Sequence, residues 1–277
     1  MLRSGQIFDR YKVQRAVAEG TTAWVYEVLH VWLHVPMALK HLHEGSDISL
    51  HYALLEEARI GCLQSHENLV SVHDALEIED RPALVMEWID GPDLAKWMDA
   101  SEQVEMPVLK SLIGGLCSGL GYAHEQGIVH RDLKPENIFL KRTHRGLVPK
   151  VGDFGMAKIL NKDAASFTLS GTYENIGTPE YMAPEQIGDP GLVDHRADLF
   201  AVGCLVYELW TGTVAFDAPD EHQAFERVLS GDRKPMLEFR PDTPPALMEL
   251  VDALLDKEPD RRPPDCRSIR RALHRIS

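Results

Sequence analysis

Short runs of β-branched and aromatic residues alternate with turn-forming residues in the first third of the chain. Runs of this kind, when glycine, proline and polar residues separate them, predict β-strands. They cover residues 11–13, 24–31, 35–39, 69–76 and 83–89. The first three follow one another closely, which predicts three antiparallel strands.

One helix is predicted between the third and the fourth of these strands. Apolar residues recur at nearly helical spacing from Leu50 to Leu63, which is typical of an amphipathic helix over residues 47–63. Residues 11–89 therefore predict a five-stranded antiparallel sheet with a single helix.

The pattern changes to helices after Gly91-Pro92, and several of these helices open with proline or aspartate in the first turn. The predicted helices cover residues 107–126, 196–212, 221–230, 245–256 and 264–276. Two long stretches, 127–141 and 150–185, have no helical pattern, and loops of that length in a compact domain usually carry function. The fold class predicted is α+β and bilobal, with a small sheet lobe and a larger, mainly helical lobe.

Composition narrows the choice of partners and compartment. The 43 acidic and 29 basic side chains give a formal charge of -14, so the surface repels nucleic acid backbones and anionic lipids. The four cysteines are far apart and form no Cys-x-x-Cys pair, which disfavours disulfides and zinc and predicts a reducing, cytoplasmic setting. The most apolar run, residues 199–210, is too short to span a bilayer.

The stretch His130-Arg131-Asp132-Leu133-Lys134-Pro135-Glu136-Asn137 carries the densest candidate chemistry. It places the Asp132 carboxylate and the Asn137 amide on one short loop with the Lys134 cation between them, which suits phosphoryl transfer. Together with Asp153-Phe154-Gly155, this stretch resembles the protein kinase family, in particular the eukaryotic-like Ser/Thr kinases of bacteria. The alternative, a polar turn that closes a strand, leaves most of the matching positions unexplained.

The resemblance implies a role for each of these side chains. Asp132 would orient the substrate hydroxyl or accept its proton, Lys134 would steady the transferring phosphoryl group, and Asn137 and Asp153 would hold a metal ion. Mg²⁺ is the metal implied, with Mn²⁺ as a second choice. Lys134 is typical of the members that act on Ser or Thr, so tyrosine is the less favoured acceptor.

The segment Met37-Ala38-Leu39-Lys40 resembles the family's Val-Ala-Ile-Lys strand, whose lysine meets the α- and β-phosphates of ATP. Taken alone, a lysine on a strand is more often a solvated charge. Glu56 and Glu57 are both available to orient Lys40, and the spacing back from His66-Glu67-Asn68-Leu69-Val70 favours Glu57. Either glutamate could instead be a charge on the solvated helix face.

The glycine-rich loop departs from the family pattern. Gly-x-Gly-x-x-Gly-x-Val is replaced by Ala18-Glu19-Gly20-Thr21-Thr22-Ala23-Trp24-Val25. An alanine restricts φ and adds a methyl group where backbone approaches phosphate, so weaker nucleotide binding or turnover is expected. Without the other motifs, the loop would be interpreted as an ordinary hairpin.

Residues 84–91 resemble the hinge between the two lobes of a kinase, with Met86 as gatekeeper and the backbone of Glu87 and Ile89 against adenine. An apolar sandwich around the adenine ring is implied by the same resemblance. The full set of implied nucleotide contacts is Ala18, Gly20, Val25, Ala38, Lys40, Glu57, Met86, Glu87, Ile89 and Phe139.

The segment Gly177–Glu185 resembles the end of a kinase activation segment, where substrate peptides dock. The resemblance implies a contact between Thr178 and the catalytic loop and a structural ion pair between Glu185 and Arg262. Asp198 would brace the backbone of the catalytic loop.

Arg131 directly precedes Asp132, and in the family this arrangement lets arginine clamp a phosphorylated activation segment. Ser170 and Thr172 best match the autophosphorylation sites of bacterial kinases of this type. The alternative is that Ser and Thr are simply common in loops.

The main hypothesis is one protein kinase domain over residues 1–277, with an N-lobe at about 11–89, a hinge at about 87–92 and a C-lobe at about 93–277. It would transfer the γ-phosphoryl group of ATP to Ser or Thr of proteins, itself included, and a dimer is compatible with it. Nucleic acid partners and a membrane span are not expected. The alternatives are a pseudokinase scaffold, favoured by the thinned glycine loop, and a small-molecule kinase, disfavoured by residues 177–185.

Overall fold

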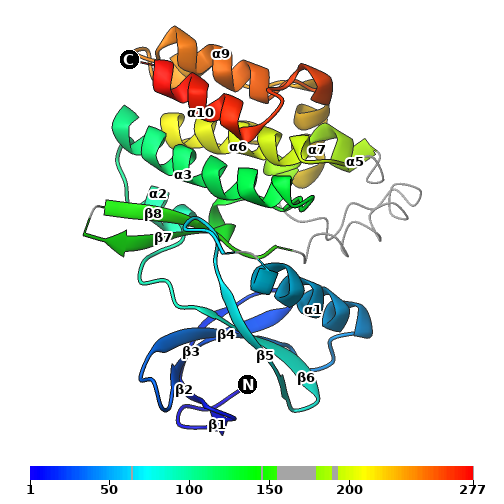
Figure 1. Cartoon of the computed structure of the whole chain (residues 1–277). Coiled ribbons are helices and arrows are strands. Elements are labelled where there is room, and N and C mark those ends of the chain that lie inside the picture. The colour runs from blue at the N-terminus through cyan, green and yellow to red at the C-terminus, as the bar shows by residue number, and fades with distance from the viewer. Residues whose placement is uncertain (64, 145, 155–178, 189–192, 277) are drawn as a thin grey trace.

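The computed structural model describes residues 1–63, 65–144, 146–154, 179–188 and 193–276. A sheet lobe that contains the N-terminus and a helical lobe that contains the C-terminus lie at opposite ends of the molecule (Figure 1). The predicted α+β, bilobal fold class is confirmed. Within the described residues, no helix is both long and apolar enough to cross a membrane.

The N-lobe is an antiparallel sheet with the strand order β1-β2-β3-β4-β6-β5. Its strands are β1 (Ile7–Phe8), β2 (Tyr11–Glu19), β3 (Ala23–His30), β4 (Pro36–Leu42), β5 (Val72–Ile78) and β6 (Arg81–Glu87). Because successive side chains point to opposite faces, Tyr26 and Val28 enter one apolar cluster while Leu42 and Leu84 enter another. The second cluster includes Leu54 of helix α1 (Ile48–Leu63), so α1 is seated on that face.

The sheet has one strand more than the five predicted. Ile7 pairs with Lys12 and Phe8 pairs with Tyr11, and the turn between them places Asp9 at a positive φ of 51°. Two residues are too few to show a strand pattern in the sequence. The prediction of five strands was therefore wrong by this short edge strand.

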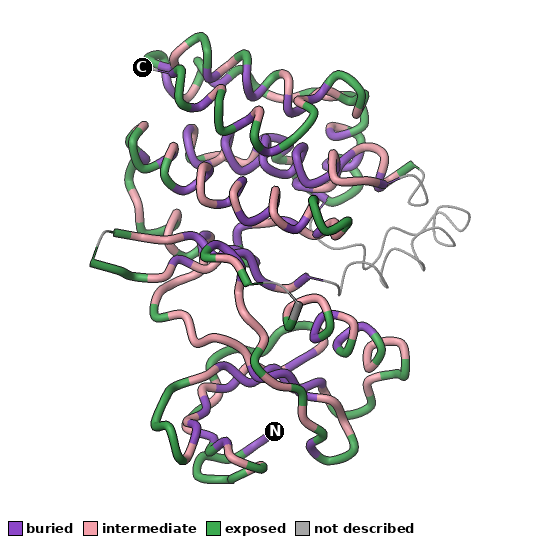
Figure 2. Tube along the Cα trace, viewed as in Figure 1, coloured by how far each residue is buried: buried purple, intermediate pink, exposed green. Residues whose placement is uncertain are grey.

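The C-lobe is built around α6 (Arg196–Thr211), which is buried along almost its whole length. Figure 2 shows the buried residues gathered in the middle of this lobe and inside the sheet. The other α-helices that the structure describes in this lobe are α2 (Leu94–Asp99), α3 (Met106–Glu125), α5 (Pro184–Gly188), α7 (Glu221–Ser230), α8 (Met236–Phe239), α9 (Pro245–Leu254) and α10 (Cys266–Arg275).

A hairpin that the sequence did not predict connects the candidate catalytic loop to Asp153. It consists of β7 (Ile138–Thr143) and β8 (Gly146–Val151) and follows the short 3₁₀ helix Pro135–Asn137. Ile138 pairs with Val151, and the Gly152 N–H donates to the Asn137 carbonyl at 2.9 Å. The hairpin therefore brings the two candidate metal-binding segments side by side.

The crossing between the lobes is packed tightly against β7. The N–H of Leu140 donates to the Pro92 carbonyl at 2.9 Å, and that of Arg142 donates to the Asp90 carbonyl at 3.2 Å. A Cβ atom on Gly91 would stand only 1.8 Å from the Leu140 carbonyl oxygen. Glycine is therefore required at this point of the hinge, because no side chain fits.

Candidate active site

Lys40 on β4 lies between two carboxylates. Its Nζ is 3.0 Å from Oε2 of Glu57 on α1 and 2.6 Å from Oδ1 of Asp153, which follows β8. Burial alone would lower the pKa of Lys40, but the charges of Asp153 and Glu57 outweigh it and raise that pKa. Lys40 is therefore a fixed ammonium that joins the sheet, α1 and the loop after β8.

The two carboxylates respond differently to sharing one cation. Burial raises the pKa of Glu57, and the attraction of Lys40 offsets this only in part. Burial also opposes ionisation of Asp153, but the charge and hydrogen bond of Lys40 prevail and lower its pKa. Asp153 therefore remains ionised, as a metal ligand must be.

Of the two glutamates that the sequence offered, the structure brings Glu57 to Lys40. Glu56 instead pairs with Arg59, one turn further along α1, at 2.6 Å. Adjacent helical positions are about 100° apart around the axis, so only one of the two can face the sheet.

The catalytic loop holds the Asp132 carboxylate through its neighbours. The Asn137 Nδ2 donates to the Asp132 carbonyl at 2.7 Å and to Asp132 Oδ2 at 3.1 Å. Lys134 Nζ is 3.1 Å from the same carboxylate, which is still 40% exposed. Asp132 is therefore fixed in position while its carboxylate stays open to solvent.

The oxygen atoms of Asn137 and Asp153 fit a hard divalent metal. The Asn137 amide nitrogen is used by Asp132, which leaves its Oδ1 as a ligand, and Lys40 uses one Asp153 oxygen and leaves the other. Mg²⁺ is commonly held by one or two protein oxygens together with substrate phosphates and water. In the part of the chain that the structure describes, no group of three or more His, Cys, Asp or Glu side chains forms another metal site.

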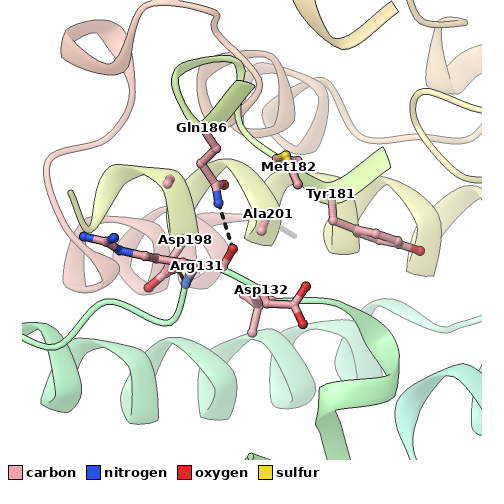
Figure 3. Close-up of a pocket in the computed structure, with 9 residues that line it drawn as sticks. Arg131, Asp132, Tyr181, Met182, Gln186, Asp198 and Ala201 are labelled. Atoms are coloured by element: carbon pink, nitrogen blue, oxygen red, sulfur yellow. Dashed lines mark hydrogen bonds between the residues drawn. The ribbon is translucent and has the colours of Figure 1, made fainter. Parts of the chain in front are cut away.

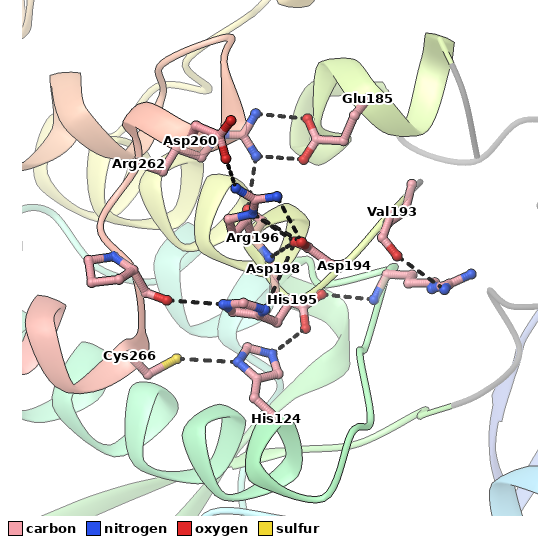
Figure 4. A network of polar contacts seen from close by, with 12 residues as sticks. His124, Glu185, Val193, Asp194, His195, Arg196, Asp198, Asp260, Arg262 and Cys266 are labelled. Atoms are coloured by element: carbon pink, nitrogen blue, oxygen red, sulfur yellow. Dashed lines mark hydrogen bonds and ion pairs between the residues drawn. The ribbon is translucent and has the colours of Figure 1, made fainter. Parts of the chain in front are cut away.

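Asp198 at the start of α6 braces the backbone of the catalytic loop. Its carboxylate accepts hydrogen bonds from the N–H groups of His130 and Arg131, both at 2.9 Å. It also lies 2.7 Å from Nε2 of His124 on α3 (Figure 4). His124 was not predicted from the sequence, because a lone histidine near a helix end is ordinarily a capping or surface residue.

His124 and Asp198 form a buried ion pair. Burial disfavours charge on both, yet their mutual hydrogen bond raises the pKa of His124 to about 10 and lowers that of Asp198. Cys266 Sγ lies 3.8 Å from His124 Nδ1, and the ring of His195 packs at 5.4 Å between centroids. Neither Cys266 nor His195 supplies a negative charge at neutral pH. Asp198 therefore provides the negative charge that stabilises protonated His124.

This ion pair predicts a stability that falls with rising pH. An unfolded histidine titrates near 6.5, so the contribution of protonated His124 is complete below that pH and is lost as pH rises toward about 10. Urea unfolding of wild type and His124→Gln should therefore give free energies whose difference shrinks between pH 7 and 10. The expected slope is at most about 1.4 kcal/mol per pH unit. A difference that stays constant over this range would contradict the charged pair.

Strand register gathers the predicted nucleotide-binding residues of the sheet. Val25 of β3 pairs with Ala18 on one side and with Lys40 on the other, and Ala38 pairs with Met86 of β6. These positions lie on adjacent strands beside the Lys40 ammonium. Their contact with a nucleotide stays a prediction.

The hinge residues are anchored through Glu87. Its side chain reaches Lys141 at 2.6 Å and Lys150 at 2.7 Å, and its N–H donates to the Ser71 carbonyl at 2.8 Å. Two residues on, the Ile89 carbonyl accepts from the Gly91 N–H at 3.1 Å. Phe139 on β7 pairs across with Asp93, which follows the hinge.

The glycine-poor loop is a tight hairpin in which the two alanines differ. The Gly20 N–H donates to the Ala23 carbonyl at 2.9 Å. The Ala23 side chain is buried in the apolar cluster with Leu42 and Leu54, whereas Ala18 is exposed. The Ala23 methyl group therefore packs into the core. The expected weakening of nucleotide binding or turnover stays a prediction.

Glu185 on α5 and Arg262 form the structural ion pair that the sequence predicted. The guanidinium donates twice, at 2.6 and 2.8 Å, and its side chain is fully buried (Figure 4). Thr178 and the candidate phosphorylation sites Ser170 and Thr172 lie outside the described residues.

Gln186 is the other residue at the site that was not predicted from the sequence. It lies on α5, beside Glu185, and contacts the catalytic loop (Figure 3). Its proximity to the Gly177–Glu185 motif was the only available signal. A polar residue inside a five-residue helix carries no pattern of its own.

The chain belongs to the protein kinase family, since the family model of the protein kinase domain matches residues 11–274. It is 36% identical over 95% of its length to the serine/threonine-protein kinase Pkn1 of Myxococcus xanthus. It is 34% identical over 95% of its length to pkn2 of the same species, and 35% identical over its whole length to PknL of Mycobacterium tuberculosis. These matches cover 38%, 32% and 68% of the respective relatives, so the chain spans about a third of the two Myxococcus proteins.

Proposed function

We propose that this chain is an ATP-dependent protein kinase domain that phosphorylates Ser or Thr hydroxyls of proteins, itself included. The observation that carries the proposal is the convergence of Lys40, Asp132, Asn137 and Asp153 from the sheet, the catalytic loop and the loop after β8. The division into an N-lobe at 11–89, a hinge at 87–92 and a C-lobe at 93–277 is part of this proposal.

The geometry supports a distinct task for each group. Asp132 would accept or orient the proton of the acceptor hydroxyl, and Lys134, 3.1 Å away, would neutralise charge on the moving phosphoryl group. Lys40 would hold the α- and β-phosphates. Bound Mg²⁺, or Mn²⁺ in its place, would supply electrostatic stabilisation of the phosphates through the oxygens of Asn137 and Asp153.

The scaffold alternative receives no comparable support. It depended on the altered glycine loop, and the burial of the Ala23 methyl group removes part of that argument. Phosphoryl transfer depends chiefly on positioning and on charge stabilisation, and the residues for both are present. The relatives' names are those of kinases.

Incubation of the chain with radiolabelled ATP and Mg²⁺, with and without a model protein substrate, tests the proposal directly. Label is expected on Ser or Thr after acid hydrolysis, and no label on any protein would contradict it. A cytoplasmic location is proposed on the cysteine content. Mass spectrometry of the same reaction would test Ser170 and Thr172 as acceptors.

The Lys40–Glu57 pair gives a prediction with a matched control. Glu57→Gln should lower the rate of transfer by roughly 10- to 100-fold, because a hydrogen bond to a charged group contributes about 1.5–3 kcal/mol. Glu56→Gln makes the same chemical change next to it, at a position that pairs with the exposed Arg59 and not with Lys40. Initial rates should leave the Glu56 variant within about twofold of wild type. Equal losses in the two variants would refute the assignment.

A further inference from the structure

Arg131, directly before Asp132, has a left-handed backbone with φ at 67°. This conformation costs a non-glycine residue about 1–3 kcal/mol and persists only where the surroundings impose it. Two side chains hold it. Asp198 accepts from the Arg131 N–H at 2.9 Å, and Gln186 Nε2 donates to the Arg131 carbonyl at 2.7 Å.

The amide of Gln186 is used at both ends. While Nε2 donates to Arg131, Oε1 accepts from the N–H of Ala183 at 3.0 Å. The side chain is only 4% exposed, and Ala183 is fully buried. Figure 3 shows Gln186 reaching from α5 down to the catalytic loop beside Tyr181 and Met182. The amide therefore joins the end of the substrate-docking segment to the residue before the candidate base.

The space around this link is nearly filled. A cavity of about 10 Å³ lies among Asp132, Tyr181, Gln186 and Ala201, which is room for about one water molecule. An apolar replacement for Gln186 would leave the Arg131 carbonyl without its protein donor, and an unpaired buried carbonyl is unfavourable.

We infer that Gln186 is a positioning residue for phosphoryl transfer: its amide fixes the Arg131 peptide, and with it Asp132, only when the segment ending at Ala183 is seated. The inference rests on the proposed kinase function. Asp198 belongs to α6, whereas Gln186 belongs to the helix that continues that segment, so Gln186 is the contact through which substrate docking couples to the base. The chemical requirement is specific, because residue 186 must present a donor to the Arg131 carbonyl and an acceptor to the Ala183 N–H at the same time.

Two variants separate this role from simple packing. Gln186→Met keeps the size and removes both hydrogen bonds. Gln186→Glu keeps the acceptor for Ala183, but it can donate to Arg131 only when its carboxyl group is protonated. Both should lower kcat for a Ser/Thr protein substrate by about tenfold or more at pH 8, since a buried carbonyl that loses its hydrogen-bond donor is strongly unfavourable. The KM for ATP should change less than twofold.

The pH profile supplies the decisive result. Burial raises the pKa of a carboxyl group, so kcat of Gln186→Glu relative to wild type should recover as pH falls from 8 to 6. The ratio for Gln186→Met should stay flat. Gln126→Glu, an exposed change at the end of α3, serves as the control for an added charge.

The contrary results are equally specific. If wild type transfers phosphate and both Gln186 variants retain kcat within twofold, or both lose it with flat pH ratios, the inference is overturned while the proposed function stands. If Gln186→Glu does not fold, the split between kcat and KM for ATP in Gln186→Met decides. A wild-type chain without transfer overturns both.

Discussion

Asp132→Asn is expected to abolish most phosphoryl transfer without unfolding the protein. Asparagine has the same shape and can keep an oxygen near Lys134, but its amide cannot accept the hydroxyl proton. General-base groups contribute about 10²- to 10⁴-fold to enzyme rates, so kcat should fall by about that factor. The Asp132 side chain is 40% exposed, and the thermal unfolding midpoint should stay within a few degrees of wild type.

The matched control for this prediction is Asp80→Asn. Asp80 lies in the turn between β5 and β6 at a φ of 60°, a conformation that asparagine also tolerates. Asp80→Asn removes the same carboxylate charge at a position far from the catalytic loop. Initial-rate measurements with radiolabelled ATP should leave this variant near wild type. The same background incorporation by wild type and Asp132→Asn would favour the scaffold alternative.

Elements whose ends carry a capping residue or a terminal glycine could be predicted from the sequence. The predicted helix over residues 221–230 matches α7 in full, because Asp220 caps its first turn and Gly231 ends it with a left-handed φ of 76°. The hairpin β7–β8 was missed because Pro149 interrupts its strand pattern and because Lys141 and Lys150 resemble surface charges. The structure engages both lysines with Glu87.

In the candidate site too, some residues could be predicted from local sequence and others only from the tertiary structure. A motif identified Lys40, Asp132, Asn137 and Asp153 because each lies at a fixed spacing from its neighbours. The orientation of a helix face decided between Glu57 and Glu56, and no local pattern encodes that choice. Burial of the Ala23 methyl group depends on α1, which lies some thirty residues away in sequence.

The roles of His124 and Gln186 could be found only from the tertiary structure. Gln186 contacts the catalytic loop directly, and His124 contacts Asp198, which in turn holds that loop. Each does so from a helix that its own sequence gives no reason to place there. Both act on backbone geometry rather than on substrate. Supporting residues of this kind have no spacing rule. Gln186 binds a peptide group, which every residue carries, and His124 binds a carboxylate on another helix.

Arg262→Met should cost about 3–5 kcal/mol of unfolding free energy, the range measured when one partner of a buried ion pair is removed. The guanidinium donates to Glu185, to the Asp256 carbonyl at 2.8 Å and to the Arg196 carbonyl at 2.9 Å. It also lies 5.0 Å from the centre of the Phe200 ring. Methionine fills much of the volume but leaves the Glu185 carboxylate, only 15% exposed, without its cation.

A double variant separates the lost attraction from the stranded charge. If the stranded carboxylate dominates, Arg262→Met with Glu185→Met should be more stable than Arg262→Met alone, because neither charge then remains buried. Arg59→Met is the control, since its pair with Glu56 is exposed and should contribute no more than about 1 kcal/mol. Urea titration at pH 7 measures all four proteins. A loss below about 1 kcal/mol for Arg262→Met would show that this pair does not hold α5 to the C-lobe. Contacts other than this ion pair would then have to hold Gln186, which lies beside Glu185, in its place.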